Sequence, residues 1–173
     1  MPCALTQGLI LDCRDSTGGL KIVKIAEFGA VSAITEASGI ISAITKVTAK
    51  RFFAYTLVSQ TGEAEESFVL NREAGTGFVK QTIKFPINKM TVAVRNELLI
   101  LAQARLLISV EDTNGLPFLY GRENGLMLTT VSAKTGTKLG DRNGYELVFE
   151  GEERTLAPTI TNAIYIALEA PGT

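Results

Sequence analysis

The spacing of hydrophobic residues changes twice within residues 77–111. Between positions 79 and 87 the apolar residues Val79, Ile83, Phe85 and Ile87 share one parity, and lysine and threonine lie on the other. This is the pattern of a strand with one buried face. The same alternation returns from Leu106 to Val110 and predicts a second strand. Residues 88–104, which join the two, follow a different period.

In residues 88–104 the apolar side chains recur at steps of three and four residues. They are Met90, Val94, Leu98 and Leu101. This spacing predicts an amphipathic helix, and Asn88 is the expected cap of its first turn. Leu99 and Ile100 are expected to widen the apolar stripe. One helix should therefore pack against a protein built mainly of strands.

Elsewhere, two-residue alternation and intervening turn residues predict strands joined by hairpins. The expected strands are residues 8–13, 20–28, 32–35, 42–45, 51–59, 106–111, 116–121, 126–131, 144–151 and 160–169. In residues 20–28 the apolar positions shift from even to odd after Ile22. Such a shift indicates a bulge or a strand that is buried on both faces. Residues 132–143 and 170–173 are expected to form a loop and a short flexible tail.

Two acidic groups stand out from this pattern. In residues 144–151 the apolar side chains face the core, and Glu146 and Glu150 fall on the opposite side. The polar residues 60–77 predict a mid-chain flap, an exposed hairpin that either is solvated or contacts a neighbouring subunit. Its candidate contact residues are Glu63, Glu65, Glu66 and Arg72.

Composition limits the classes of protein to which the chain can belong. The 173 residues are 46% hydrophobic and 20% charged, with a formal net charge of -1. This is too apolar for a disordered chain and fits one domain, residues 1–173, with a mid-chain flap. The near-zero charge offers no general attraction for nucleic acid or anionic lipid. No stretch has the pattern of a signal peptide or a membrane span, so work in a cytoplasm or in an assembly built there is expected.

The sequence presents no visible catalytic chemistry. Histidine is absent, which removes the commonest general base near neutral pH and most zinc sites. Cys3 and Cys13 are expected to be free thiols, although pairing across a small hairpin is the alternative. No catalytic, cofactor-binding or metal-binding residue is expected, and an enzyme is the least favoured class.

The order of elements resembles that of phage tail tube proteins and related tail-assembly proteins of the virion. The resemblance lies in N-terminal hairpins, the flap at 60–77, one helix at 88–104 and the strand GYELVFEGEE at 144–153. The stretches 3–16 and 135–145 are similar to short virion proteins of phages that infect Bacteroidetes-type hosts.

This resemblance implies a mainly β (α+β) fold, in which two packed antiparallel sheets form a sandwich or barrel with one flanking helix. It also implies self-assembly into sixfold rings that stack into a tube for DNA. The flap would then contact neighbouring subunits, and other phage tail proteins would be partners within the virion tail, with no membrane involved. Glu146 and Glu150 are candidates to face the lumen, where DNA would pass without being gripped.

Two other interpretations remain open. A tail terminator, a connector ring or a capsid decoration protein has the same kind of domain but stops at a single ring or layer. A protein of another class, a monomeric β-barrel that binds a small apolar ligand, requires an internal cavity. The expected lining of that cavity is Phe52, Phe53, Tyr55 and Phe85.

Overall fold

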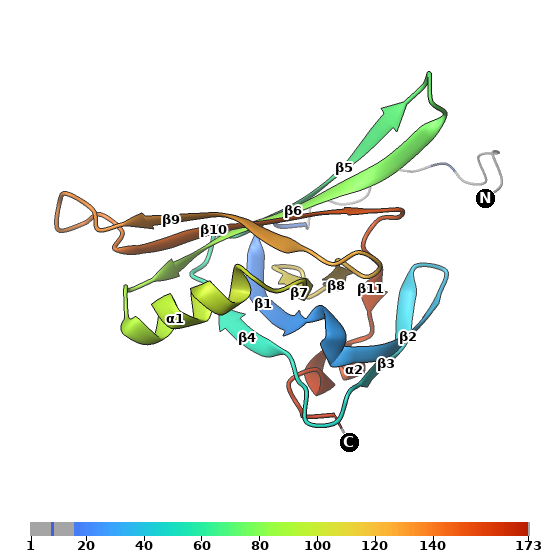
Figure 1. The fold of residues 1–173 in the computed structure, drawn as a ribbon, viewed down its shortest axis with the longest axis horizontal. Helices are drawn as coiled ribbons and strands as arrows, with labels where there is room; N and C mark the ends of the chain where they lie inside the picture. Colours follow the sequence, from blue (N-terminus) through green and yellow to red (C-terminus); the bar gives the residue numbers. More distant parts are fainter. Residues whose placement is uncertain (1–7, 9–15, 173) are drawn as a thin grey trace.

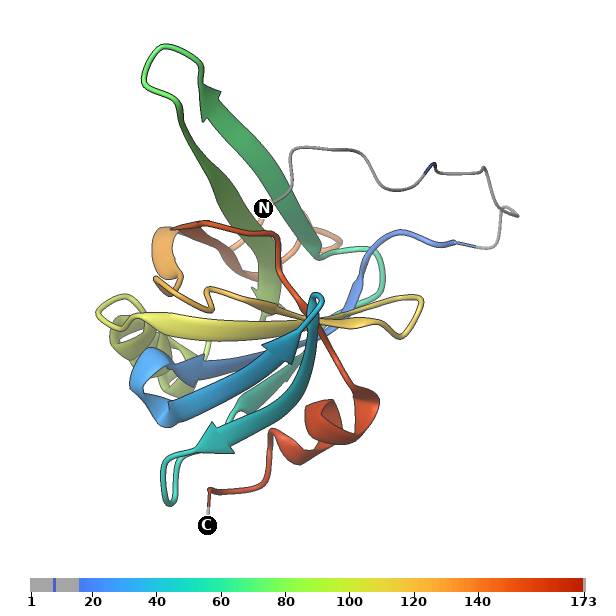
Figure 2. The same ribbon diagram turned by 90° about the vertical axis from the view of Figure 1, so that its right-hand side faces the viewer.

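The computed structural model describes Gly8 and residues 16–172, whose strands form two sheets. One sheet has seven strands in the order β2-β3-β11-β8-β7-β1-β4, and the other has four in the order β5-β6-β10-β9. The two sheets are stacked, with α1 beside them and α2 beyond the seven-stranded sheet (Figures 1 and 2). The predicted fold class, a mainly β sandwich with one main helix, is confirmed.

The elements follow one another along the chain with short connections. The strands are β1 (Leu20–Glu27), β2 (Val31–Ala37), β3 (Ile40–Lys46), β4 (Phe53–Thr56), β5 (Glu63–Asn71), β6 (Thr76–Asn88), β7 (Leu106–Asp112), β8 (Pro117–Tyr120), β9 (Met127–Lys134), β10 (Gly144–Glu153) and β11 (Thr159–Ile160). The helices are α1 (Val92–Leu101), α2 (Asn162–Ala167) and the short 3-10 helix η1 (Phe28–Ala30). The short strand β11 runs parallel to β3, and the other strand pairs are antiparallel.

Several hairpins agree with the sequence pattern. The pairs β2/β3 and β7/β8 are antiparallel hairpins, in line with the strands expected at 32–35 and 42–45 and at 106–111 and 116–121. The register of β1 against β7 shifts between Leu20 and Ile22, an irregularity that agrees with one of the two alternatives expected for residues 20–28. The expected strand at 8–13 and both cysteines, Cys3 and Cys13, lie outside the described residues.

The central strands of the seven-stranded sheet, β1, β7 and β8, are buried on both faces. One face packs against the four-stranded sheet and α1, through a cluster that includes Val23, Ile25, Ile83, Phe85, Leu98, Leu101, Ile108, Leu147 and Phe149. The other face packs against α2, through a second cluster that includes Ala26, Ile41, Phe52, Leu107, Leu119, Tyr165 and Leu168. Burial on both sides explains why the apolar positions of β1 occupy both parities.

The predicted start of α1 was wrong. Asn88 is the last residue of β6, where it lies opposite Gly144 of β10, so its backbone is extended. The cap is instead Thr91, whose hydroxyl accepts a hydrogen bond from the Val94 amide at 3.2 Å. The buried side of the helix is as predicted, but Leu99 and Ile100 are exposed and do not widen the buried stripe.

The predicted final strand at 160–169 was also wrong. Only Thr159–Ile160 is strand, and α2 follows it. Tyr165 and Leu168, three residues apart, fill the second cluster. The last carbonyls of a helix lack the usual partners within the helix, and here two lysines add hydrogen bonds to carbonyls that also accept from the Leu168 and Ala170 amides. Lys24 Nζ donates to the Tyr165 carbonyl at 2.8 Å, and Lys46 Nζ donates to the Ala167 carbonyl at 2.6 Å.

The ends of two other segments differ from expectation. Strand β9 continues to Lys134, so the loop expected from residue 132 begins later. The tail expected to be flexible is hydrogen-bonded to an earlier part of the chain. Gly172 donates to the Lys50 carbonyl at 2.8 Å and accepts from the Ala49 amide at 3.0 Å.

We expect Leu147→Ala to lower the free energy of unfolding by about 2–5 kcal/mol, because it empties a fully buried position between the sheets. Leu139→Ala is the matched control, since Leu139 is fully exposed, and it should change the free energy by less than about 0.5 kcal/mol. Urea unfolding followed by circular dichroism measures both changes. Equal effects of the two substitutions would contradict the assignment of the core.

Candidate assembly surfaces

The outer face of the four-stranded sheet carries charged residues of both signs. Alternate residues of β10 point into the core, and those between them point outward. The antiparallel register aligns outward residues of neighbouring strands, as it does Glu150 with Thr82 and Glu65 with Thr82. The charged members of this outer face are Glu63, Glu65, Lys80, Lys84, Lys134, Glu146, Glu150 and Glu152.

Cross-strand ion pairs neutralise most of these charges. Lys80 Nζ lies 2.9 Å from Glu150 Oε1, and Lys134 Nζ lies 2.8 Å from Glu146 Oε2. Lys84 Nζ lies 3.8 Å from Glu63 Oε2. The two glutamates predicted to face a lumen therefore share one surface, but each is paired with a lysine.

The hydrogen bond from Lys134, its positive charge and that of Arg142 hold the pKa of Glu146 below its usual value. The hydrogen bond and the charge of Glu150 raise the pKa of Lys80. Both shifts favour the charged forms at neutral pH. The face is therefore a lattice of fixed, largely compensated charges, with more carboxylates than ammonium groups.

Both outer strands of the small sheet have an open edge. Strand β5 pairs with β6 alone and β9 with β10 alone, so within the described residues no strand covers their other sides. An edge strand presents unpaired backbone donors and acceptors, which can pair with a strand of another chain.

The β5/β6 hairpin extends beyond the body of the molecule (Figures 1 and 2). Pairing between β6 and β10 ends at Val79, so the distal part of the hairpin, residues 69–78, has two strands and no sheet beside it. The flap was expected at residues 60–77; from here on the name denotes residues 68–78, the projecting part together with Phe68 at its base. Phe68 and Leu70 of the flap are 62% and 71% exposed, an unusual position for large apolar side chains.

The four candidate flap residues are in different surroundings. Glu63 and Glu65 lie on the charged sheet face, and Arg72 is exposed at the tip. Glu66 faces inward, where its Oε1 accepts hydrogen bonds from Gln81 Nε2 at 2.9 Å and from the Ala157 amide at 2.7 Å. Of the four, only Arg72 lies on the projecting part of the hairpin, and Glu66 fixes the base of β5 to the body.

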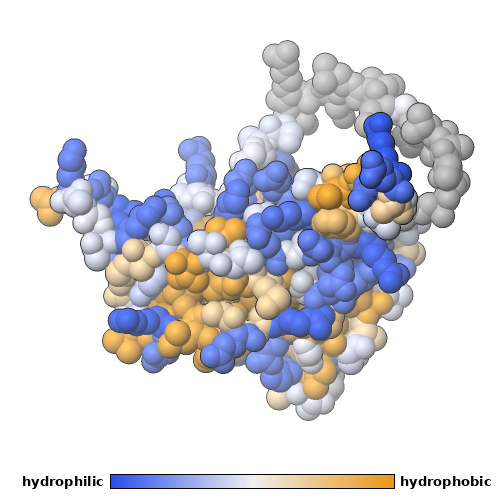
Figure 3. Space-filling view, turned by 45° about the horizontal axis from the view of Figure 1, so that its top comes forward, coloured by the Kyte–Doolittle hydropathy of each residue, from blue (hydrophilic) through white to orange (hydrophobic). Residues whose placement is uncertain are grey.

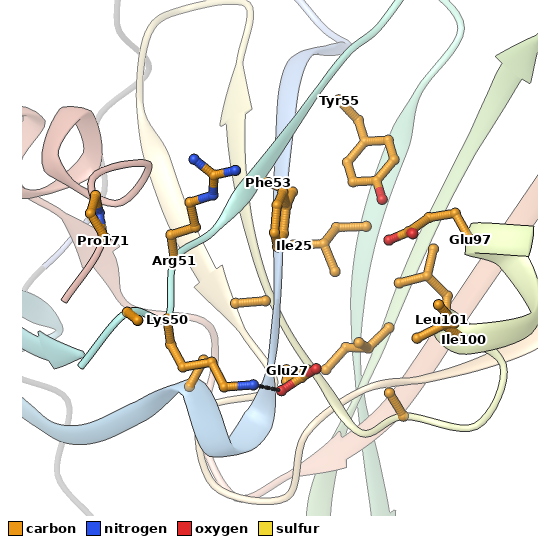
Figure 4. Close-up of a pocket in the computed structure, with 15 residues that line it drawn as sticks. Ile25, Glu27, Lys50, Arg51, Phe53, Tyr55, Glu97, Ile100, Leu101 and Pro171 are labelled. Atoms are coloured by element: carbon orange, nitrogen blue, oxygen red, sulfur yellow. Dashed lines mark hydrogen bonds and ion pairs between the residues drawn. The ribbon is translucent and has the colours of Figure 1, made fainter. Parts of the chain in front are cut away.

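A groove that the sequence did not predict lies between α1 and β4 (Figure 4). Its volume is about 440 Å³, and its apolar lining includes Ile25, Phe53, Ile100, Leu101 and Leu106. Burial, together with the charge of Glu97, raises the pKa of Tyr55 to about 12, so this hydroxyl is neutral at physiological pH. The signal in the sequence was Ile100, an apolar side chain of α1 that the core leaves exposed.

The aromatic residues expected to line one internal cavity do not do so. Phe52 is buried in the cluster under α2, and Phe85 is buried between the sheets, where it stacks on Phe149 with ring centroids 5.5 Å apart. Phe53 and Tyr55 line the open groove instead. The internal ligand cavity required by the β-barrel alternative is therefore not formed by these four residues.

A space-filling view shows how polar and apolar surfaces are distributed. Hydrophilic side chains gather over the upper part of the view in Figure 3, and an apolar area lies below them.

Within residues 16–172 no three potential metal ligands lie close enough together to hold an ion. No helix in the same range is both long and apolar enough to cross a membrane.

Comparison with protein-family models, with functionally characterised proteins and with solved structures found no match for this chain. The fold and its surfaces are therefore the basis for a functional proposal.

Replacing Lys134 with methionine should raise the pKa of Glu146, because the variant removes the ammonium group that donates to this carboxylate. A carboxylate with a lowered pKa stabilises the folded state at neutral pH and loses that contribution as the pH falls through its folded pKa. NMR titration of the Glu146 carboxyl carbon measures the shift. Lys50→Met, which breaks an ion pair on the other sheet, should leave it unchanged. Equal pKa values for Glu146 in Lys134→Met and the native chain would contradict the ion pair.

Proposed function

We propose that this chain is a structural protein of a bacteriophage tail, whose copies join into rings that stack into a tube for DNA. The observation that carries the proposal is the four-stranded sheet with two open edges. A sheet edge that is long and uncovered either joins another strand or risks uncontrolled association. Assembly through both edges satisfies the backbone groups of each copy.

The strand directions of this sheet suit head-to-tail joining. All its pairs are antiparallel, so β5 and β9, at opposite edges of four strands, run in opposite directions. Pairing of β9 in one copy with β5 in the next continues the antiparallel order. A head-to-tail contact repeated by rotation closes into a ring when the rotation angle between neighbouring copies is a whole fraction of a full turn. Six copies is the number that the resemblance to tail tube proteins implies.

Such a ring would turn the charged outer face toward its centre, because the opposite face of the small sheet packs on the rest of the domain. Glu146 and Glu150 would then line the lumen together with the lysines that pair with them. A compensated surface with a small excess of carboxylates offers no cluster of cations for phosphate to bind. DNA would pass through the tube without being held. The tube would contact other tail proteins only at its ends.

The ring proposal predicts that the native protein forms rings in negative-stain images and that Val131→Lys abolishes them. Val131 lies on the edge strand β9, and a lysine on an edge strand opposes pairing with another strand. Val92→Lys on α1 is the matched control, because Val92 is exposed and outside both sheets. Negative-stain images should show rings for the control and none for Val131→Lys. A native protein that remains monomeric at high concentration would remove the proposal.

The lumen assignment predicts that Glu146→Lys combined with Glu150→Lys makes the rings bind DNA. The variant breaks the ion pairs of Lys134 with Glu146 and of Lys80 with Glu150. It thereby creates a basic cluster inside the ring. A gel-shift measurement should detect binding that weakens steeply with salt. Glu27→Lys is the control, since it removes the carboxylate of a comparable ion pair, with Lys50, on the other sheet. Equal DNA binding by this control would contradict an inward position of the small sheet.

A further inference from the structure

The flap presents two apolar side chains on one face. Phe68 pairs with Val79 and Leu70 with Gly77, so the side chains of Phe68 and Leu70 point to the same side of the hairpin. Gly77 leaves room for Leu70, because a Cβ at position 77 would come within 2.7 Å of Leu70 Cδ2. Leu70 therefore lies across Gly77 on the surface of the flap.

The groove between α1 and β4 is a receptor of matching chemistry. Its volume of about 440 Å³ lies in the range of pockets that hold drug-sized ligands, roughly 300–1,000 Å³, and so accommodates two such side chains. Ile25, Leu101 and Leu106 form part of its apolar lining, and Phe53 and Ile100 remain exposed at its sides.

Charges near the two surfaces are complementary. Arg51 and Glu97 line the groove, and within the described residues neither has an ion-pair partner. Arg72 and Glu73 lie at the tip of the flap. Neither of them has an ion-pair partner within the described residues. An approach of the flap to the groove therefore offers each of the four charges a partner of opposite sign.

The flap of the same copy is not the occupant, because it points away from the body at the end remote from α1 (Figure 1). We propose that the flap of one copy inserts Phe68 and Leu70 into the α1–β4 groove of a second copy. The contact is head-to-tail and leaves one flap and one groove free, so it can repeat from copy to copy. This inference rests on the proposed function, in which it names the contact between successive rings.

The test uses two variants of exposed residues, Leu70→Asp for the flap and Ile100→Asp for the groove. Both are made in the Val131→Lys background, so that pairing of sheet edges does not contribute. Substitution of exposed residues has little effect on folding, which circular dichroism checks. Leu116→Asp is the control, because Leu116 is exposed in the β7–β8 turn, outside both surfaces.

The parent and the control are expected to self-associate in sedimentation velocity, and each test variant alone should associate about tenfold more weakly or not at all. An equimolar mixture of the two test variants should form dimers, because one contributes an intact flap and the other an intact groove. A mixture that remains monomeric while the parent associates overturns the inference. Association of Leu70→Asp alone as strong as that of the parent also overturns it, since the groove then has another occupant.

Cysteine cross-linking in the chain with intact sheet edges gives an independent measurement. Cys3 and Cys13 are first replaced by serine. Copies carrying Leu70→Cys and copies carrying Ile100→Cys should then form a mixed disulfide. Copies carrying Leu116→Cys are the control and should form no disulfide with either. Rings without this cross-link remove the inference and leave the ring proposal. A cross-link without rings removes the ring proposal and leaves the contact, and the loss of both removes both.

Discussion

Burial of both faces of the central strands β1, β7 and β8 of the seven-stranded sheet is the constraint on which the rest of the structure depends. Strand β1 contributes Val23 and Ile25 to one cluster and Ala26 to the other. Apolar area on both sides must leave water for the domain to be stable. The four-stranded sheet and α1 cover one side, and α2 covers the other. The four-stranded sheet consequently has only one buried face, and its other face and its edges are available for contacts.

The cover on the α2 side depends on buried polar groups as well as on apolar packing. Lys24 is almost fully buried, where it lies 2.9 Å from Glu169 Oε1, 3.8 Å from the centre of the Tyr165 ring and within hydrogen-bonding distance of the Tyr165 carbonyl. A buried ammonium group is tolerated only when such partners offset its lost hydration. The same lysine adds a second, shorter hydrogen bond to the Tyr165 carbonyl, which also accepts from the Leu168 amide at 3.4 Å. This explains how six residues with an alternating sequence are held as a helix.

The surfaces proposed for assembly differ in their physical character. The sheet edges offer directional backbone hydrogen bonds, the charged face offers compensated ion pairs, and the flap and groove offer apolar area. The sheet edges leave backbone groups unpaired in one copy, and the flap and groove leave apolar side chains exposed. A protein whose unsatisfied groups lie on complementary surfaces is suited to assembly, because association then satisfies groups that folding alone does not.

The sequence by itself determined most of the strands, because period-two alternation in segments such as Gly144–Glu153 reports directly which side chains face a core. It also determined the buried side of α1 and the presence of Glu146 and Glu150 on one outward face. The residues at 160–169 show the limit of this signal, since Tyr165 and Leu168 fit both a strand and a helix until their packing partners are known. Only the tertiary structure decided between them, through a lysine more than a hundred positions away. It alone paired the lysines with the outward glutamates and formed the groove between α1 and β4, because these contacts join residues that no local period relates.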